Sequence, residues 1–579
     1  MKPASTGDLR EFFRQLAVEE DRVVTGQLAP DRLGLTMRVA INELDLAEFI
    51  ARTDGISPDQ EQDLQILRMG VARCLRLMLS LHEGFPYHAL TLRRKNQPVA
   101  RVTRTLGYLG FIQHARRIAQ TVQAGATSFS KSASGRFEFS MPARLVDNEG
   151  VERDIDEHYR REHLRVRDEL FSSPEGLRAS TTIRELLDEN VFVFRGHFIG
   201  YSGDPLLDRH YFTIAWSDLQ DAGDFDSFNE LREFGGVRFL KYLLAVAFVN
   251  SAAMKHEAFA RALCRKDNNI VFDDILTISA DKSGVIDSLM GALNQYGADF
   301  VNYTETNREE AEKIYDIISL SRRNVELLDN PVAAVPCTIE FSAGGIVQFL
   351  AGRHRQMEFV LDALRMKYPA EYDANQQTRE RSFQKAIENL LQSSFPGLET
   401  RRNIHIREGR RDLTDVDLVV IDRIFGNLFL LQLKFQDRPG PDFRRQASRM
   451  GRFKRESVKW LQALGAWLER ADDKKLRETF QIPRDVTVRR IRKLVIGRHH
   501  AWPLREVGVD DDTAYANWPQ LTNAVLLMER QQGDFRTLDG LFASLRKHIV
   551  GAPDRYYVNE GEQEYVLDGL TFAIVQAAD

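Results

Sequence analysis

The chain has 579 residues, enough for three or four domains at roughly 100–200 residues each. With 43% apolar and 28% charged residues, it has the composition of an ordinary soluble globular protein. Its three cysteines lie far apart without CxxC spacing, which argues against a disulfide scaffold or a structural zinc site. The beginning of the chain lacks an apolar signal core, and the longest apolar run, 239–249, contains Lys241 and is too short to span a bilayer. We therefore expect a cytoplasmic protein with no membrane partner.

The charge is unevenly distributed along the chain. Residues 401–500 hold 25 Lys and Arg against 13 Asp and Glu, a net charge of +12. Because the total is −5, the rest of the chain carries −17. A basic block inside an acidic protein favours a polyanionic partner such as nucleic acid. The alternative is a solvated arginine-rich surface without a partner.

The first 340 residues are expected to form two domains. Residues 1–145 are typical of an α-rich domain, in which Ser57, Pro58 and Gln60 form a capping box at the start of one helix. The alternating stretch 127–145 predicts a β-hairpin. Residues 146–340 predict a mixed, mainly helical middle domain that contains the strand "VFVFRGHFIGY". We expect this N-terminal region to recognise a substrate, a partner protein or a second copy of the chain.

A different pattern begins near residue 375. It predicts a helix at 379–395, strands at 401–407, 414–424 and 427–435, a long basic helix, and a strand at 491–500. This order is typical of a compact α/β domain, which we place at 341–505. Residues 506–579 are expected to be a C-terminal extension that packs on this domain.

Two of these strands are predicted to form a hairpin with polar residues at one end. Gly426 and Asn427 tolerate the positive φ of a two-residue turn, so Phe425 should face Leu428. Side chains alternate along a strand. One face should then be apolar: Val416, Leu418, Val420, Phe429, Leu431, Leu433 and Phe435. The other face should hold Val419 and Ile421 and, away from the turn, the polar residues Asp415, Asp417, Gln432, Lys434 and Gln436.

In this arrangement Asp417 and Lys434 are diagonal neighbours across the two strands. A carboxylate or an ammonium group that leaves water needs an ionic partner or a metal. One interpretation is a structural ion pair between Asp417 and Lys434 at a sheet edge. That pair alone does not explain why Asp415 and Gln432 lie beside it.

These two strands, "DVDLVV" and "LLQLK", resemble the motif of the PD-(D/E)XK, or restriction-endonuclease-like, nuclease superfamily, in its Mrr-like QxK form. The resemblance covers about residues 375–505. It implies an α/β domain whose mixed central sheet is flanked by helices. It also implies a Mg²⁺-dependent phosphodiester hydrolase, an endonuclease rather than an exonuclease, that acts on DNA, with RNA not excluded. Proteins of this plan often serve bacterial restriction or anti-phage defence.

The resemblance assigns a role to each matching residue. Asp417 and the amide oxygen of Gln432 would hold Mg²⁺, for which Mn²⁺ can substitute, and Lys434 would activate or orient the attacking water. Many members add a glutamate from the preceding helix, for which Glu388 is the candidate here; a solvent-exposed glutamate is the alternative. Gln432 replaces the commoner glutamate and makes the site less negative. A nuclease-fold module that binds nucleic acid without cutting, or an adaptor whose basic block docks an acidic protein surface, therefore remains open.

The basic helix supplies the candidate residues for binding nucleic acid. Arg445, Arg449, Arg452 and Lys459 fall near one helical stripe. Arg410 and Arg411, just before the second strand, would extend this surface. Lys and Arg that neutralise backbone phosphates bind nucleic acid without regard to sequence.

Overall fold

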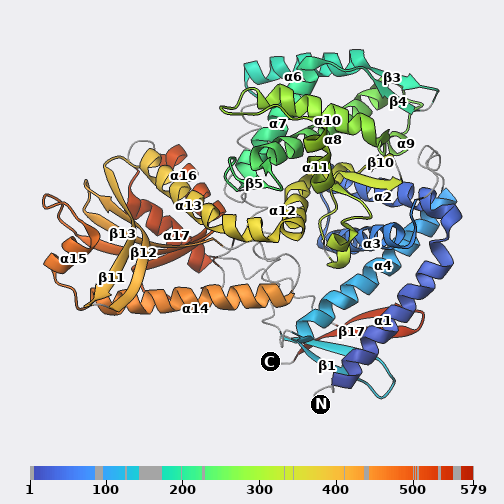
Figure 1. Ribbon diagram of the computed structural model, residues 1–579. Helices are drawn as coiled ribbons and strands as arrows, with labels where there is room; N and C mark the ends of the chain where they lie inside the picture. Colours follow the sequence, from blue (N-terminus) through green and yellow to red (C-terminus); the bar gives the residue numbers. More distant parts are fainter. Residues whose placement is uncertain are drawn as a thin grey trace.

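The protein is a mixed α/β structure (Figure 1). The computed structural model describes residues 6–84, 96–123, 127–142, 172–196, 198–223, 228–331, 333–342, 344–409, 411–435, 443–499, 501, 504, 508–532, 536–551 and 562–577. Within these ranges, no helix is both long and apolar enough to cross a membrane.

One hydrophobic core joins most of the N-terminal helices. Its buried residues run from Leu28 to Leu109 and again from Phe212 to Tyr372. The structure therefore departs from the predicted boundaries at 145 and 340, because both sides of each boundary contribute to the same core. The helices of this region are α1 (Thr6–Gln27), η1 (Pro30–Arg32), α2 (Leu33–Thr53), α3 (Pro58–Leu81), α4 (Asn96–Gln123), α6 (Pro174–Asn190), α7 (Pro205–Gly223), α8 (Phe239–Lys266), α9 (Phe272–Ile275), α10 (Lys282–Gly297), α11 (Arg308–Ile318), η3 (Val325–Asp329), η4 (Leu350–His354) and α12 (Gln356–Lys367).

The predicted start of α3 is confirmed. The amide of Gln60 donates to Ser57 Oγ at 3.3 Å, and the amide of Ser57 donates to the Gln60 side chain at 2.8 Å. These reciprocal bonds satisfy amides that the first helical turn leaves without partners. By contrast, the stretch predicted as a single strand at "VFVFRGHFIGY" is two short strands, because Arg195 and Gly196 both have positive φ and reverse the chain.

Short sheets complete the N-terminal region. Strands β3 and β4 pair with each other, as do β5 and β6, and β7, β10, β9 and β8 form a four-stranded sheet in that order. These strands are β3 (Val191–Phe194), β4 (Phe198–Tyr201), β5 (Glu233–Phe234), β6 (Val237–Arg238), β7 (Ser279–Asp281), β8 (Ser319–Leu320), β9 (Thr338–Ser342) and β10 (Gly345–Gln348).

The end of the chain returns to the N-terminal region. The predicted hairpin, β1 (Ser128–Lys131) and β2 (Phe137–Pro142), is extended by β17 (Leu570–Ala577) and β16 (Gln563–Leu567). Strand β17 runs parallel to β2. It lies beside α1 and β1 in Figure 1 and buries Phe572 in one core with Phe12. The last strands therefore pair with the N-terminal region, whereas the prediction placed them in an extension that packs on the domain at 341–505.

The C-terminal domain is built on a five-stranded mixed sheet. The order is β11 (Leu398–Glu408), β12 (Arg411–Asp422), β13 (Asn427–Lys434), β14 (Arg490–Gly497) and β15 (Thr513–Asn517). The first three strands are antiparallel, and β13, β14 and β15 are parallel. One face packs on α13 (Pro369–Ser394), α16 (Trp518–Gln532) and α17 (Leu538–Gly551). The other face packs on α14 (Phe443–Leu468) and α15 (Asp473–Phe480). The expected mixed sheet flanked by helices is confirmed, and residues 513–551 complete it.

The β12–β13 hairpin pairs in a different register from the predicted one. Leu428 faces Ile421, not Phe425, because the turn spans Arg423 to Gly426. Asp422 makes this longer turn: its side chain accepts the amides of Ile424 and Phe425 at 3.0 Å each. The register moves by four residues, an even number, so nearly all side chains keep their predicted faces.

Val416 is the exception to the predicted faces. It packs with Val419 on the α14 side of the sheet, whereas Leu418 packs on the α13 side. The alternation of the strand is therefore interrupted between Val416 and Leu418, at Asp417.

A buried arginine links the two regions of the protein. The Arg379 guanidinium on α13 lies 5.0 Å from the ring centre of Phe228 and 4.6 Å from that of Phe435. Phe228 belongs to the N-terminal core, and Phe435 directly follows β13. The same helix contributes Tyr372 to the N-terminal core and Phe383 to the C-terminal one, so α13 is shared by both.

Candidate functional site

The candidate site lies where β12 and β13 stop pairing. Their last ladder pair is Leu418 with Leu431, so the next position brings Asp417 opposite Gln432. Asp417 Oδ2 accepts the Leu433 amide and the Gln432 side-chain amide, each at 2.6 Å. At this end of the hairpin, the Asp417 carboxylate thus accepts the kind of hydrogen bond that a backbone carbonyl accepts within the ladder.

The ladder between β11 and β12 is interrupted at the same level. Arg402 pairs with Leu418 and Ile404 with Val416, but Asn403, which stands between them, has a left-handed φ of 52°. A left-handed residue in a strand breaks the regular alternation. Asp417 therefore lies at a break in its pairing with both neighbouring strands.

Helix α13 holds this break in place through an amide. Gln384 Nε2 donates to the Asp417 carbonyl at 2.5 Å and to Asn403 Oδ1 at 3.1 Å. Phe383 and Ile387, both fully buried, fix this part of the helix against the sheet. Gln384 thus positions the Asp417 backbone and leaves its carboxylate directed toward β13.

Lys434 meets a carboxylate from the basic helix. It lies diagonally across from Asp417, and its Nζ is 3.3 Å from Glu456 Oε2 on α14. Arg452, one turn earlier, donates to Glu456 Oε1 at 2.7 Å. Trp460, one turn later, is buried and donates its indole N–H to the Asp415 carbonyl at 2.6 Å, which fastens α14 to β12.

The electrostatics at Asp417 favour a cation. Burial raises the pKa of Asp417 to about 6; the Leu433 amide opposes this shift, the Asp415 carboxylate adds to it, Lys434 opposes it, and Glu380 adds to it. Glu380 is exposed on α13, one turn before Gln384. A partly desolvated carboxylate beside two others is stabilised in its charged form by a positive charge.

The oxygen atoms at the site fit a cation that keeps most of its water. Gln432 uses its nitrogen toward Asp417, which leaves Oε1 as its acceptor, and Asp417 offers Oδ1 as a second oxygen. Mg²⁺ is often held by one or two carboxylates and retains several waters. Among the residues that the structure describes, no three His, Cys, Asp or Glu side chains are grouped as a metal cage. Within the described residues, Asp417 and Gln432 are therefore the candidates to hold such an ion.

Glu388 is not brought to the site. It is buried on α13, bonded through Oε2 to Arg402 Nε at 2.6 Å and through Oε1 to the Thr400 hydroxyl. Both partners belong to β11, and the ion pair satisfies the buried carboxylate. Of the glutamates on α13, Glu380 acts on Asp417 instead.

The predicted nucleic-acid contacts are only partly described. Arg452 and Lys459 are exposed on α14, and Arg449 is partly buried on the same helix. Arg411 is exposed at the start of β12. Arg410 and the side chain of Arg445 lie outside the described residues.

Several residues at the site were not predicted from the sequence. Glu456 carried a weak signal, because it follows Arg452 by four residues on one helical face. Asn403 carried a weak signal, because asparagine tolerates a left-handed backbone better than most residues do. Arg498 donates its amide to the Lys434 carbonyl at 2.9 Å, which follows only from the parallel pairing of β13 and β14.

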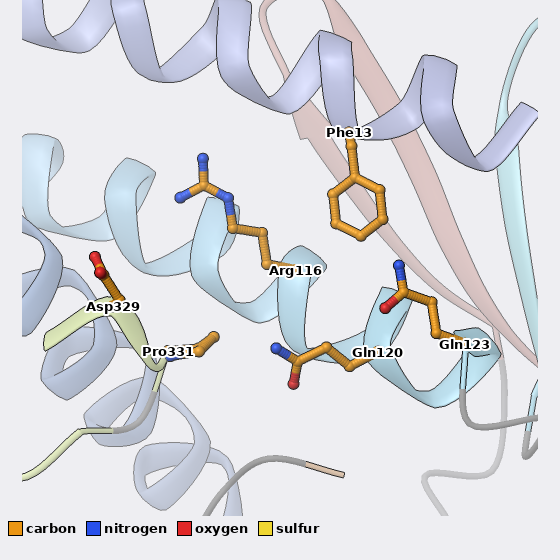
Figure 2. Close-up of a pocket in the computed structure, with 6 residues that line it drawn as sticks. All are labelled: Phe13, Arg116, Gln120, Gln123, Asp329 and Pro331. Atoms are coloured by element: carbon orange, nitrogen blue, oxygen red, sulfur yellow. The ribbon is translucent and has the colours of Figure 1, made fainter. Parts of the chain in front are cut away.

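A shallow groove of about 410 Å³ lies elsewhere, between α1 and α4 (Figure 2). Its two charged residues are already paired: Arg116 with Glu20 at 2.9 Å and Asp329 with Arg76 at 2.7 Å. The remaining polar groups are the amides of Gln120 and Gln123. This arrangement supplies no acid–base pair, so we place the candidate site at Asp417.

The chain was compared with protein families, curated proteins and solved structures, and none of the three comparisons found a match.

Proposed function

We propose that the protein is a metal-dependent nuclease that hydrolyses phosphodiester bonds, with DNA as its substrate. The observation that carries this proposal is the convergence of Asp417, Gln432 and Lys434 where the β12–β13 ladder opens. Two oxygen ligands and a lysine at one strand end are the groups that such a hydrolysis needs.

The residues of the chain have distinct roles in this proposal. Asp417 and Gln432 would hold Mg²⁺, which when bound neutralises phosphate charge and lowers the pKa of a bound water. Lys434 adds a fixed positive charge within range of Asp417 and stabilises the negative charge that develops during hydrolysis. Gln384 and the Leu433 amide keep the Asp417 carboxylate oriented.

The surroundings of the site support a polyanionic substrate. Arg452 and Lys459 are exposed on α14, the helix that contributes Glu456 to Lys434. Strands β13, β14 and β15 run parallel, so they end at the same edge of the sheet as Lys434. Ligands of α/β sheets commonly bind at this carboxyl edge.

The topology of the domain supports the restriction-endonuclease-like fold. A helix precedes three antiparallel strands, the helices α14 and α15 follow, and the next strands add in parallel. This is the order in which the motif "DVDLVV" and "LLQLK" is expected to be presented. The fold and the motif residues therefore support the same proposal independently.

A second candidate is a nucleic-acid-binding module that does not cut. The observation in its favour is that Gln432 leaves Asp417 as the one carboxylate among the three motif residues. Such a site binds a divalent ion less strongly than one with two carboxylates. The basic helix would still bind phosphates.

A cleavage assay over several substrates tests the proposal. Wild-type protein is incubated with supercoiled plasmid, linear duplex, single-stranded DNA and RNA, with Mg²⁺ or Mn²⁺. Lys434→Ala is the test variant, and Lys474→Ala, an exposed lysine on α15, is the matched control. We expect cleavage by the wild type and the control and at least a hundredfold loss in Lys434→Ala, as for the removal of one electrostatic stabiliser.

The other outcomes separate the alternatives. DNA binding in a gel-shift assay without cleavage of any substrate would favour the binding module. Cleavage that persists in Lys434→Ala would contradict the role of this lysine. Absence of nucleic-acid binding at low salt would remove both candidates and leave the adaptor.

A further inference from the structure

Glu456 bridges two cations that the nuclease would need for its substrate. One carboxylate oxygen accepts Lys434 Nζ at 3.3 Å, and the other accepts Arg452 Nε at 2.7 Å. The carboxylate therefore lies between the lysine of the motif and Arg452, an exposed arginine of the basic helix. The two oxygens of the Glu456 carboxylate are thus bound by two different cations.

The packing of α14 fixes this position. Phe453, Ser457 and Trp460 are buried, which fixes the backbone of α14 at Glu456, so displacement of the carboxylate requires only a rotation of its own side chain. The side chains themselves remain accessible from solvent. The exposed fraction is 38% for Glu456, 71% for Arg452 and 20% for Lys434.

The geometry points to a phosphate position. We propose that Lys434 and Arg452 form a binding site for one backbone phosphate of nucleic acid, and that Glu456 occupies this site until the nucleic acid displaces it. The inference rests on the proposed function for the identity of the polyanion. The non-bridging oxygens of a phosphodiester present the same charge and a similar two-oxygen geometry to the two cations.

The exchange is energetically feasible. Partly exposed ion pairs contribute little to stability, because water and salt screen them. Binding of a nucleic-acid phosphate releases counterions that had condensed on the nucleic acid, and this release favours binding. The carboxylate of Glu456 gains no such contribution. Glu380 also acts on both Arg452 and Asp417, so the phosphate position lies within electrostatic range of the proposed metal site.

Removing the charge of Glu456 should therefore tighten binding. Glu456→Gln keeps the shape of the side chain but no longer competes for the two cations. One additional phosphate contact corresponds to an affinity about tenfold higher at about 0.1 M salt, and to a salt slope steeper by about 1. Arg452→Ala in the Glu456→Gln background should cancel most of this gain.

Fluorescence anisotropy with a short labelled DNA duplex measures the effect. The titrations are done with EDTA, so that binding is recorded without cleavage, and over a range of salt concentrations. Glu469→Gln, an exposed glutamate just beyond α14, is the matched control and should bind like the wild type. Glu456→Ala is the second variant, and thermal unfolding shows whether each variant is folded.

The outcomes separate this inference from the proposed function. Tighter binding by both Glu456 variants with a steeper salt slope supports the phosphate position, even if no cleavage is found in Mg²⁺. Equal or weaker binding by folded Glu456 variants overturns it, even if the wild type cuts DNA. Absence of DNA binding in all proteins overturns it as well.

Discussion

Asp417 and Gln432 face each other where the β12–β13 ladder stops, and the chemistry at this position depends on the identity of residue 432. The side-chain amide of Gln432 donates to the Asp417 carboxylate and so stabilises its negative charge in the absence of a metal. A glutamate there would add a second carboxylate to a group whose pKa is already raised to about 6 by burial. The amide thus stabilises the metal-free site and weakens its attraction for a cation.

Gln432→Glu should destabilise the metal-free protein and strengthen its binding of a cation. Without metal, we expect a lower melting temperature, because two carboxylates repel each other and Asp417 loses a donor. With Mg²⁺, we expect a larger stabilisation than in the wild type, since a tighter site binds the folded state at lower ion concentration. Differential scanning fluorimetry over a Mg²⁺ series measures both. Gln392→Glu, on the exposed side of α13, should respond to Mg²⁺ like the wild type; an equal response of both variants would argue against a metal at Gln432.

Asp45, a buried aspartate outside the candidate site, has a strongly raised pKa. It is buried on α2 and accepts the amides of Leu350 and Ala351 at 3.1 and 2.7 Å. Burial raises its pKa to about 8 from an ordinary value of 3.8, although both amides and Arg353 oppose the shift. Between these two values the folded protein holds a proton that the unfolded chain releases. This contribution to stability is complete at low pH and is lost as the pH rises toward 8.

Asp45→Asn should remove that pH dependence. The asparagine side chain does not titrate, and its single oxygen keeps one of the two amide bonds, which Asp45 accepts through different oxygens. We expect the melting temperature of the variant to fall less than that of the wild type between about pH 5 and about pH 8. Asp54→Asn, at the exposed end of α2, should follow the wild type. Parallel curves for Asp45→Asn and the wild type would show that Asp45 titrates normally.

At the scale of elements, the hairpin was predictable in its faces but not in its turn. Gly426 and Asn427 indicated the reversal, yet Asp422 also binds Asn427 and two turn amides, which lengthens the loop. The resulting shift of four residues preserved the grouping of Asp417, Gln432 and Lys434. Val416 could not be assigned correctly, because the interruption beside it depends on the left-handed Asn403 of another strand.

Gly426 gives a test of this turn with a control of the same conformation. Gly426 and Gly409 both have positive φ, 73° and 61°. A Cβ at Gly426 would meet the Thr487 carbonyl oxygen at 2.2 Å, whereas nothing lies within 4 Å at Gly409. Gly409→Ala should lower the free energy of unfolding by about 1–2 kcal/mol through backbone strain alone. Gly426→Ala should cost clearly more in urea unfolding, and equal costs would contradict the observed turn.

At the scale of the whole molecule, the sequence predicted the α/β class and the C-terminal sheet, but not the division into domains. The periodicity of each helix was readable, whereas the shared core of residues 28–109 and 212–372 depends on contacts between distant segments. The pairing of β17 with β2 joins residues more than 400 positions apart. No local sequence pattern indicates such a pairing. Residues 562–577 were therefore predicted to pack on the C-terminal domain, whereas they pair with the N-terminal hairpin.

The C-terminal strand should be required for the N-terminal sheet. Phe572 is fully buried with Phe12 and Phe139, so Phe572→Ala should cost about 3–5 kcal/mol. Val566→Ala on the neighbouring strand β16 removes a side chain that is 70% exposed and should change little. Limited proteolysis should then cut the N-terminal region of Phe572→Ala first. Equal protection in both variants would contradict the observed return of the chain.

The proposed function requires that Asp417 binds the ion that drives phosphodiester hydrolysis. The most direct test is a single-turnover assay with protein in excess over a labelled DNA duplex, first in EDTA and then after addition of Mg²⁺. Asp412→Asn, an exposed aspartate on the same strand, is the control for Asp417→Asn. We predict that cleavage starts on addition of Mg²⁺ in the wild type and in Asp412→Asn, and that Asp417→Asn binds the duplex without cutting it. Two results would contradict this role of Asp417. One is cleavage by Asp417→Asn at the wild-type rate, and the other is no cleavage by the wild type at any Mg²⁺ or Mn²⁺ concentration.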